Sequence, residues 1–233
     1  NYLVTTQNGL DLYNIITQQW APRSSNGLLR NMNKVLTENR SMGPAHIFTD
    51  KKGRTWSDIW LNGKKEAGPQ VFSYNPADDS WNEYKKSIDI ASMAYHSIDG
   101  FLEQKNGDIW LHGTSLFAKF NEEKKIFEDV RNESLKLNGI DLETIYQLYE
   151  DRDANIWISS SNGLFMFNPG KQIFSNLTNI RKGKDEFKNS VDAVLQSKSR
   201  IIYVSTWGAG IFAYDSNFNV VANPLIPIAK DNN

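Results

Sequence analysis

The feature that most constrains the fold of this chain is an aromatic residue followed by Asn or Asp, which returns at an almost constant interval. The pairs are Tyr74-Asn75, Phe120-Asn121, Phe167-Asn168 and Tyr214-Asp215, separated by 46, 47 and 47 residues. A large hydrophobic residue lies three positions before each pair, and Trp110, Trp157 and Tyr203 lie ten or eleven positions before the last three pairs. A fixed period of this length indicates a chain built from repeated structural units.

The N-terminal part of the chain follows the same pattern. Tyr13-Asn14 has Leu10 three residues before it and Trp20 seven after it, but Tyr74 follows only after 61 residues, about 14 more than one period. We place this excess in the polar segment 21–45. The repeat therefore predicts five units in a single segment 1–233, approximately at 1–24 (a partial unit), 44–86, 96–130, 143–178 and 190–223, with a tail at 224–233.

Each unit has the pattern of four short strands. In one copy, residues 144–150, 155–158 and 164–167 are rich in β-branched and aromatic residues and precede a fourth strand that starts at Ile173. No longer stretch shows a convincing helical period; residues 133–142 are the best helical candidate, and 60–70 is expected to be an extended loop. Four strands in a repeat of about 47 residues are typical of a β-propeller, so we expect an all-β fold of four-stranded antiparallel blades.

Composition argues against several classes of function, among them nucleic-acid binding and metal binding. The formal net charge is −1, which argues against nucleic acid or an anionic membrane as the main partner, because both need a basic surface. No run approaches about 18 apolar residues, and no signal-peptide pattern occurs in this chain. Cysteine is absent, which excludes a disulfide scaffold, and the three histidines lack metal-like spacing. We therefore expect no metal and no cofactor.

Two segments carry a more specific motif. Residues 149–164 read Tyr-Glu-Asp-Arg-Asp-Ala-Asn-Ile-Trp-Ile-Ser-Ser-Ser-Asn-Gly-Leu, and residues 103–114 read Glu-Gln-Lys-Asn-Gly-Asp-Ile-Trp-Leu-His-Gly-Thr. Partial copies lie at 5–10 and 205–211. This motif resembles the two-component regulator propeller repeat, and the resemblance covers nearly the whole chain.

The resemblance implies a fold and a function. Such repeats form the periplasmic sensor of hybrid two-component systems in gut Bacteroidetes that sense polysaccharide fragments, with two seven-bladed propellers followed by a β-sandwich, a membrane helix and a histidine kinase. We accordingly expect about five blades of a seven-bladed ring, which needs roughly 330 residues, and not a closed five-bladed ring. The expected partners are an oligosaccharide, the remaining propeller, β-sandwich and kinase regions of the same polypeptide, and a second copy in a homodimer.

Candidate ligand-binding residues come from loops, because strands supply the scaffold in propellers. Trp207 lies in a short loop outside the packing column, so its indole is a candidate for stacking on sugar rings; packing between blades is the alternative. Trp56, Trp110 and Trp157 fall in repeat columns and are expected to be core residues. The candidate binding residues are Trp207, Trp60, Tyr95, His96, His112, Asn162, Arg40 and Arg181.

Other functions stay open from the sequence alone. Arginines in the loops that join units could pair with the carboxylate or sulfate of an anionic sugar, although scattered surface arginine is the default interpretation; they are Arg23, Arg30, Arg40, Arg131 and Arg181. Asp78-Asp79 and Glu122-Glu123 are expected to be solvated turn acids. No catalytic motif is found, so this segment is expected not to be an enzyme. The alternatives are a secreted polysaccharide lyase or sialidase-like glycosidase, and a protein-interaction scaffold.

Overall fold

The structure is a computed structural model, and it describes residues 2–6, 9–39, 44–62, 67–84, 97–130, 142–170, 173–177, 190–207 and 210–221. The chain divides into two compact units. The first unit holds residues 1–111 and 118–129, and the second holds residues 112–117 and 130–233. No helix in the described ranges is long and apolar enough to cross a membrane.

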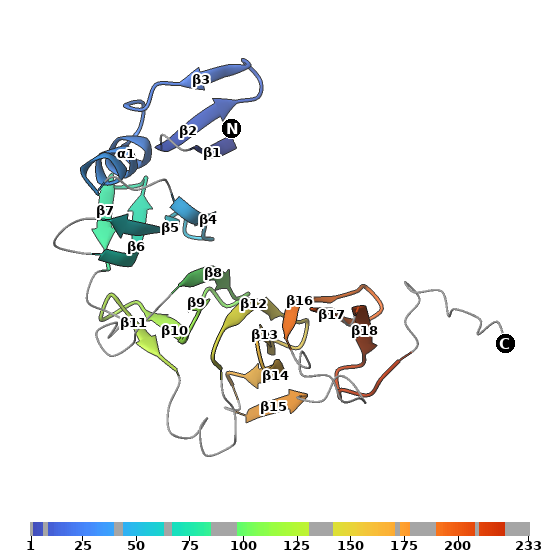
Figure 1. The fold of residues 1–233 in the computed structure, drawn as a ribbon. Coiled ribbons are helices and arrows are strands. Elements are labelled where there is room, and N and C mark those ends of the chain that lie inside the picture. Colours follow the sequence, from blue (N-terminus) through green and yellow to red (C-terminus); the bar gives the residue numbers. More distant parts are fainter. Residues whose placement is uncertain are drawn as a thin grey trace. The chain divides into compact units, whose positions relative to one another are not determined.

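In the part of the chain that the structure describes, five antiparallel sheets follow one another, and each is built from consecutive strands (Figure 1). The first sheet has three strands, β1 (Tyr2–Thr6), β2 (Gly9–Asn14) and β3 (Gln19–Ala21). The second sheet contains β4 (Pro44–Thr49), β5 (Thr55–Asn62), β6 (Ala67–Asn75) and β7 (Ser80–Glu83). The third contains β8 (Ile98–Glu103), β9 (Ile109–Gly113), β10 (Leu116–Asn121) and β11 (Ile126–Asp129).

The fourth sheet contains β12 (Ile145–Glu150), β13 (Ile156–Ser160), β14 (Gly163–Asn168) and β15 (Ile173–Leu177), and the fifth contains β16 (Val191–Gln196), β17 (Ile202–Thr206) and β18 (Gly210–Tyr214). The order within each sheet follows the chain, as a simple up-and-down meander. The prediction of successive antiparallel sheets with up to four strands is therefore confirmed. The boundaries of the five repeat units stay a prediction.

The tryptophan column of the repeat is explained by a buried acceptor in the turn before it. Asp151 is fully buried, and its Oδ1 accepts hydrogen bonds from the backbone N–H of Asp153 and Asn155, at 2.9 Å each. Its Oδ2 accepts a hydrogen bond from the indole Nε1 of Trp157 at 2.8 Å. Bonds to a charged acceptor are roughly twice as strong as neutral ones. One carboxylate therefore shapes the turn and fixes the orientation of the core tryptophan.

The second and third sheets repeat this arrangement in the first unit. Asp50 accepts from the Nε1 of Trp56 at 2.8 Å, and the side-chain oxygen of Gln104 accepts from the Nε1 of Trp110 at 2.7 Å. All three tryptophans are buried, so the prediction that they are core residues is confirmed.

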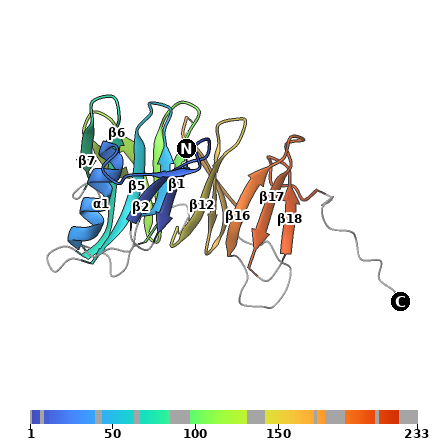
Figure 2. The same cartoon turned by 90° about the horizontal axis from the view of Figure 1, so that it is seen from above.

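Helix α1 (Gly27–Asn39) is the main departure from the expected all-strand pattern. The sequence was expected to hold no convincing helix, yet Leu28, Met32 and Leu36 recur at helical spacing and are buried. Asn26 caps the helix, because its Oδ1 accepts the N–H of Leu29 at 2.9 Å. The helix packs against β5 and β7 of the second sheet and against β2 of the first (Figures 1 and 2). The helical candidate 133–142 lies, apart from Leu142, outside the described residues.

The expected loop at 60–70 was also wrong. Strand β5 continues to Asn62, and Trp60 pairs with Pro69 on β6. Ile59 and Leu61 are buried in the cluster that contains the apolar face of α1. Because alternate residues of a strand face opposite sides, burial of these two residues leaves Trp60 exposed. The β5–β6 hairpin is longer than the corresponding hairpins of the other sheets because the apolar face of α1 packs against its inner face.

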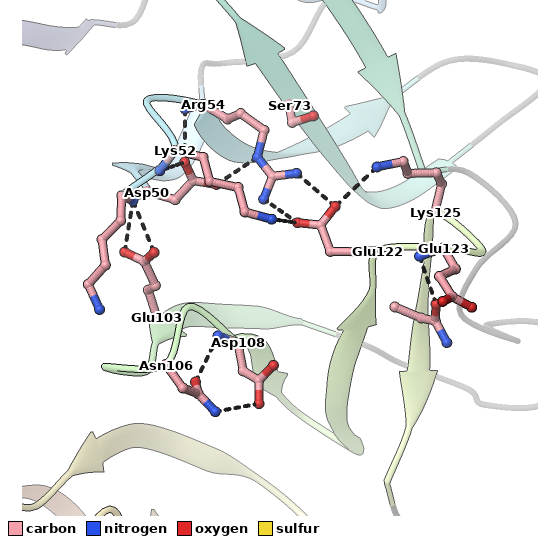
Figure 3. A network of polar contacts seen from close by, with 12 residues as sticks. Asp50, Lys52, Arg54, Ser73, Glu103, Asn106, Asp108, Glu122, Glu123 and Lys125 are labelled. Atoms are coloured by element: carbon pink, nitrogen blue, oxygen red, sulfur yellow. Dashed lines mark hydrogen bonds and ion pairs between the residues drawn. The ribbon is translucent and has the colours of Figure 1, made fainter.

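A charged network joins the second and third sheets within the first unit (Figure 3). Glu122 accepts hydrogen bonds from Arg54 at 2.7 and 3.1 Å, from Lys52 at 2.7 Å and from Lys125 at 3.0 Å. Arg54 is mostly buried, pairs with Asp50 at 2.8 Å, and lies 5.0 Å from the ring centre of Trp56. Glu122 is therefore an ion-paired residue, in contrast to the solvated turn acid that was expected.

The network changes the acidity of Glu122. Burial raises the pKa of this carboxyl, but the hydrogen bonds from Arg54, Lys52 and Lys125 outweigh that effect and lower the pKa from 4.5 to about 2. The side chain is 38% exposed, so water screens part of the interaction.

Trp157→Phe tests the acceptor–indole bond. The substitution leaves the buried Asp151 without its indole donor and opens a small void, so we expect the free energy of unfolding to fall by about 2–3 kcal/mol. The measurement is urea denaturation, with Trp20→Phe as the control because Trp20 is exposed. Equal losses in the two variants would contradict the assigned role.

Glu122→Gln tests the charged network. A lowered folded pKa contributes stability above the unfolded value near 4.5, and this contribution is lost as the pH falls toward about 2. We expect the variant to lose about 1 kcal/mol at neutral pH after screening, and the difference in Tm from the parent to shrink on acidification. Glu123→Gln, at the exposed neighbouring position, serves as the control. A pH-independent difference would refute the electrostatic explanation.

Candidate functional site

Three hairpins, β1–β2, β13–β14 and β17–β18, share one closing bond. A hydroxyl at the end of one strand donates to the carbonyl oxygen of the glycine that starts the next; the pairs are Thr6–Gly9 at 3.2 Å, Ser160–Gly163 at 3.0 Å and Thr206–Gly210 at 3.1 Å. These glycines have φ values of 133°, 140° and 90°, a region that favours glycine. The closure leaves Ser161, Asn162 and Trp207 in the turns themselves.

In the second unit, these turns are tied to the starts of the first strands. The N–H of Ser161 donates to the carbonyl of Thr144 at 3.0 Å, and the N–H of Trp207 donates to the carbonyl of Ser190 at 3.2 Å. Thr144 directly precedes β12, and Ser190 directly precedes β16. The turn and the beginning of the first strand therefore lie at the same end of each sheet.

The first strands of the fourth and fifth sheets are irregularly paired at this end. The pairing of β12 with β13 shifts between Ile145 and Gln147, and the pairing of β16 with β17 shifts between Val191 and Ala193. The residues at the two shifts are Tyr146 and Asp192, and both are exposed. An extra residue in a strand redirects its side chain away from the regular alternation. Tyr146 and Asp192 were not predicted from the sequence, because the alternation of side chains along a strand marks no special residue at an irregularity.

The two irregular strands are neighbours within the second unit. The Oε1 of Gln147 accepts from the N–H of Val194 at 2.8 Å, and the hydroxyl of Ser159 lies 3.4 Å from the carbonyl of Asp192. These bonds link the fourth sheet to the fifth. We call the resulting set of exposed and half-buried positions the turn-end surface; it consists of the exposed Tyr146, Asp192 and Trp207 and the half-buried Ser161 and Asn162.

The turn-end surface combines flat rings with short polar side chains. Trp207 is 68% exposed and Tyr146 is 40% exposed. Aromatic faces stack on the apolar faces of sugar rings, while hydroxyl, amide and carboxylate groups can bond to sugar hydroxyls. The Oδ1 of Asn162 accepts from Ser161 at 2.7 Å, which orients the amide. The described part of this surface is suited to binding an uncharged polar ligand with ring faces.

Two of the residues expected from sequence, Trp207 and Asn162, thus lie on one surface. Trp60 belongs to the first unit, where it is exposed on β5. Tyr95, His96, Arg40 and Arg181 lie outside the described residues. Their role in binding stays a prediction.

His112 was expected in a short loop, but the structure places it on a strand. It is buried on β9, and its Nδ1 is 3.0 Å from the carbonyl oxygen of Ile145 on β12. A carbonyl can only accept, so this nitrogen carries the hydrogen. Within the second unit, the imidazole joins His112 to β12, and its burial explains why it is not available to a ligand.

A second polar cluster lies in the first unit. The Nδ1 of His46 on β4 is 3.0 Å from the Oδ1 of Asp58 on β5, and the backbone N–H of His46 bonds to the same oxygen. Asp58 is buried. The hydrogen bond to Asp58 raises the pKa of His46 above its ordinary value of 6.5, although burial opposes this.

Asp99 on β8 adds a second carboxylate to this cluster. Burial raises the pKa of Asp99 most, the hydrogen bond from Ser97 and the nearby His46 lower it, and the charge of Asp58 raises it further. Protonated His46 therefore balances negative charge contributed by strands of the second and third sheets.

His46→Gln tests this charge balance. A raised folded pKa means that protonated His46 stabilises the fold below about pH 6.5, and that this contribution disappears as the pH rises through the folded value. We expect the variant to lower the Tm most below about pH 6 and least above about pH 8. NMR titration of the His46 ring in the parent protein provides the control. A constant Tm difference from acid to alkaline pH would count against the assignment.

Comparison with known proteins rests on structure, because no family model and no curated protein matches this sequence. The extracellular domain of BT4673 from B. thetaiotaomicron, described as a proposed hybrid two-component system, matches with a TM-score of 0.62 and 15% identity over 96% of this chain and 28% of that one. PorZ, a surface component of the type IX secretion system of Porphyromonas gingivalis, matches with a TM-score of 0.57 and 17% identity over 95% of this chain and 32% of that one.

A protein described as a proposed gluconolactonase matches with a TM-score of 0.51 and 12% identity, over 95% of this chain and 71% of that one. The chain spans less than a third of the length of the extracellular domain of BT4673, and the same holds for the PorZ structure. At these identities the likeness concerns the fold. Together with the four-stranded sheets, it confirms that the chain has the β-propeller fold found in the extracellular domain of BT4673.

Proposed function

We propose that this chain is part of a non-catalytic, periplasmic ligand-sensing propeller of a hybrid two-component system, and that it recognises an oligosaccharide. The observation that carries the proposal is the turn-end surface, where Trp207 and Tyr146 are exposed beside Ser161, Asn162 and Asp192. Large exposed aromatic rings beside hydroxyl and amide groups are what a sugar ring requires: a stacking face and hydrogen-bond partners around its rim.

The fold and the sequence motif support the sensing role. The repeat motif resembles that of two-component regulator propellers, and the fold is shared with the extracellular domain of BT4673. In such a system the partners are the remaining propeller, β-sandwich and histidine kinase regions of the same polypeptide. A ligand changes the activity of the kinase only if it binds two arrangements of the sensor with unequal affinity. The propeller then contributes binding energy and no chemistry.

Trp207→Ala tests the proposed binding surface. Loss of the indole removes a stacking face, so we expect at least tenfold weaker binding, which corresponds to about 1.4 kcal/mol. The measurement is calorimetry with cello-, xylo-, manno- and arabino-oligosaccharides, and with oligogalacturonate as an acidic member of the panel. Trp20→Ala is the matched control, because it removes an exposed indole from the first unit.

Two outcomes would overturn the proposal. One is the absence of binding to every member of the panel, and the other is equal affinity of the Trp207→Ala and parent proteins for the oligosaccharide that binds.

An enzyme is the second candidate. It is favoured by the fold likeness to the proposed gluconolactonase and by the His46–Asp58 pair, in which a buried carboxylate orients an imidazole. Turnover of a sugar lactone or an oligosaccharide by the parent protein, abolished in Asp58→Asn, would favour a propeller hydrolase or lyase. A third candidate, an interaction scaffold, would be favoured by capture of a protein partner without any sugar binding.

A further inference from the structure

A groove of about 430 Å³ lies on the first unit, and none of its lining residues belongs to the turn-end surface. One wall is formed by Arg23 and Ser24, which precede α1. The other is one face of α1, with Arg30, Asn33, Lys34, Thr37 and the carboxylate of Glu38. Residues three and four positions apart share a helix face, so Arg30, Lys34 and Thr37 lie along one stripe. Three cationic side chains from two segments therefore line one groove.

The groove is held in shape by bonds to β2. The amide of Asn33 pairs with the backbone of Leu10, accepting its N–H at 3.0 Å and donating to its carbonyl at 2.9 Å. Arg23 makes two bonds to the carboxylate of Asp11, at 2.7 and 3.0 Å. Both walls are thus anchored to the same strand, which reduces the ordering cost of binding a ligand between them.

Two of the three cationic side chains, Arg30 and Lys34, can donate further hydrogen bonds to a ligand. Arg30 meets Asp79 through the single nitrogen Nη2 at 2.9 Å, whereas a guanidinium can form two parallel bonds to one oxyanion. The Nζ of Lys34 is 3.9 Å from Glu38, which is longer than a hydrogen bond. Both side chains are exposed. A ligand oxyanion could therefore bond to Arg30 and Lys34 without breaking the existing hydrogen bonds.

We propose that this groove is a binding site for the oxyanion of a small ligand, the carboxylate of a sugar acid or the sulfate of a sulfated sugar. The planar guanidinium matches the geometry of either group, and Lys34 adds a point charge one helical turn away. Asp11 and Asp79 balance the charge of the two arginines they bind, and the lining carboxylate of Glu38 lies 3.9 Å from Lys34. The site therefore suits a single oxyanion rather than a polyanion.

The groove contains two arginines that the sequence places in one loop without indicating that they lie together. Arg23 and Arg30 were expected to be scattered in a loop, and helix α1 brings them to one groove. The site is independent of the oligosaccharide surface on the second unit, so either proposal can fail while the other holds.

The test is an NMR titration of the 233-residue protein at constant ionic strength. The probes are inorganic sulfate, glucuronate, glucose 6-sulfate and glucose. We expect saturable shifts of α1 amide signals with the charged probes and none with glucose. The comparison of glucuronate with glucose 6-sulfate identifies which oxyanion the groove prefers.

Variants assign the binding to the groove. Arg30→Gln combined with Lys34→Gln should weaken binding at least tenfold. The control combines Lys124→Gln with Lys125→Gln, which removes the same charge from exposed positions of the same unit. Asp79→Asn should tighten binding severalfold, because it removes a competing carboxylate while keeping an acceptor for the hydroxyl of Tyr74. This gain cannot result from unfolding.

Three results would overturn the proposal: no saturation with any charged probe, equal weakening by the two double variants, or unchanged binding in Asp79→Asn. Trp207→Ala is expected to bind sulfate as the parent does, which separates this site from the proposed oligosaccharide surface.

Discussion

The structure depends on a buried acceptor in the turn between the first two strands of a sheet. In the fourth sheet, the carboxylate of Asp151 shapes the turn through two backbone N–H groups and holds the indole of Trp157. Asp50 does the same for Trp56 in the second sheet. A buried carboxylate is costly unless all its bonds are made, so turn and core tryptophan form together. This coupling explains why each of these sheets has the same register at its centre.

The opposite ends of the fourth and fifth sheets carry the turn-end surface, which we propose as the binding surface. A hydroxyl–glycine bond closes the turns of the fourth and fifth sheets, and the irregularities at Tyr146 and Asp192 redirect two side chains of the first strands. At the end with the buried acceptor, the polar groups thus stabilise the turn and the core. The other end exposes Trp207 and Tyr146, as expected of a scaffold that carries binding loops.

Much of the fold could be predicted because its signals are local. The strands around Trp157, and the burial of Trp56, Trp110 and Trp157, follow from periodicity and turn residues. Helix α1 was predictable in principle, since Leu28, Met32 and Leu36 recur at helical spacing, but the surrounding Ser, Asn and Arg residues favoured a loop. The long β5–β6 hairpin was not predictable, because its inner face is buried only by that helix.

The sequence by itself determined the repeat, the strand pattern and the aromatic core, because each depends on residues close together in the chain. It also singled out Trp207, since that tryptophan falls outside the packing column. Only the tertiary structure decided which polar groups come together. His112 contacts the carbonyl of Ile145, His46 pairs with Asp58, and Glu122 pairs with Arg54. Likewise, Arg23, Arg30 and Lys34 line one groove. These groups come from different strands, sheets or the helix. Their contacts are set by packing, and packing leaves no periodic trace in the sequence.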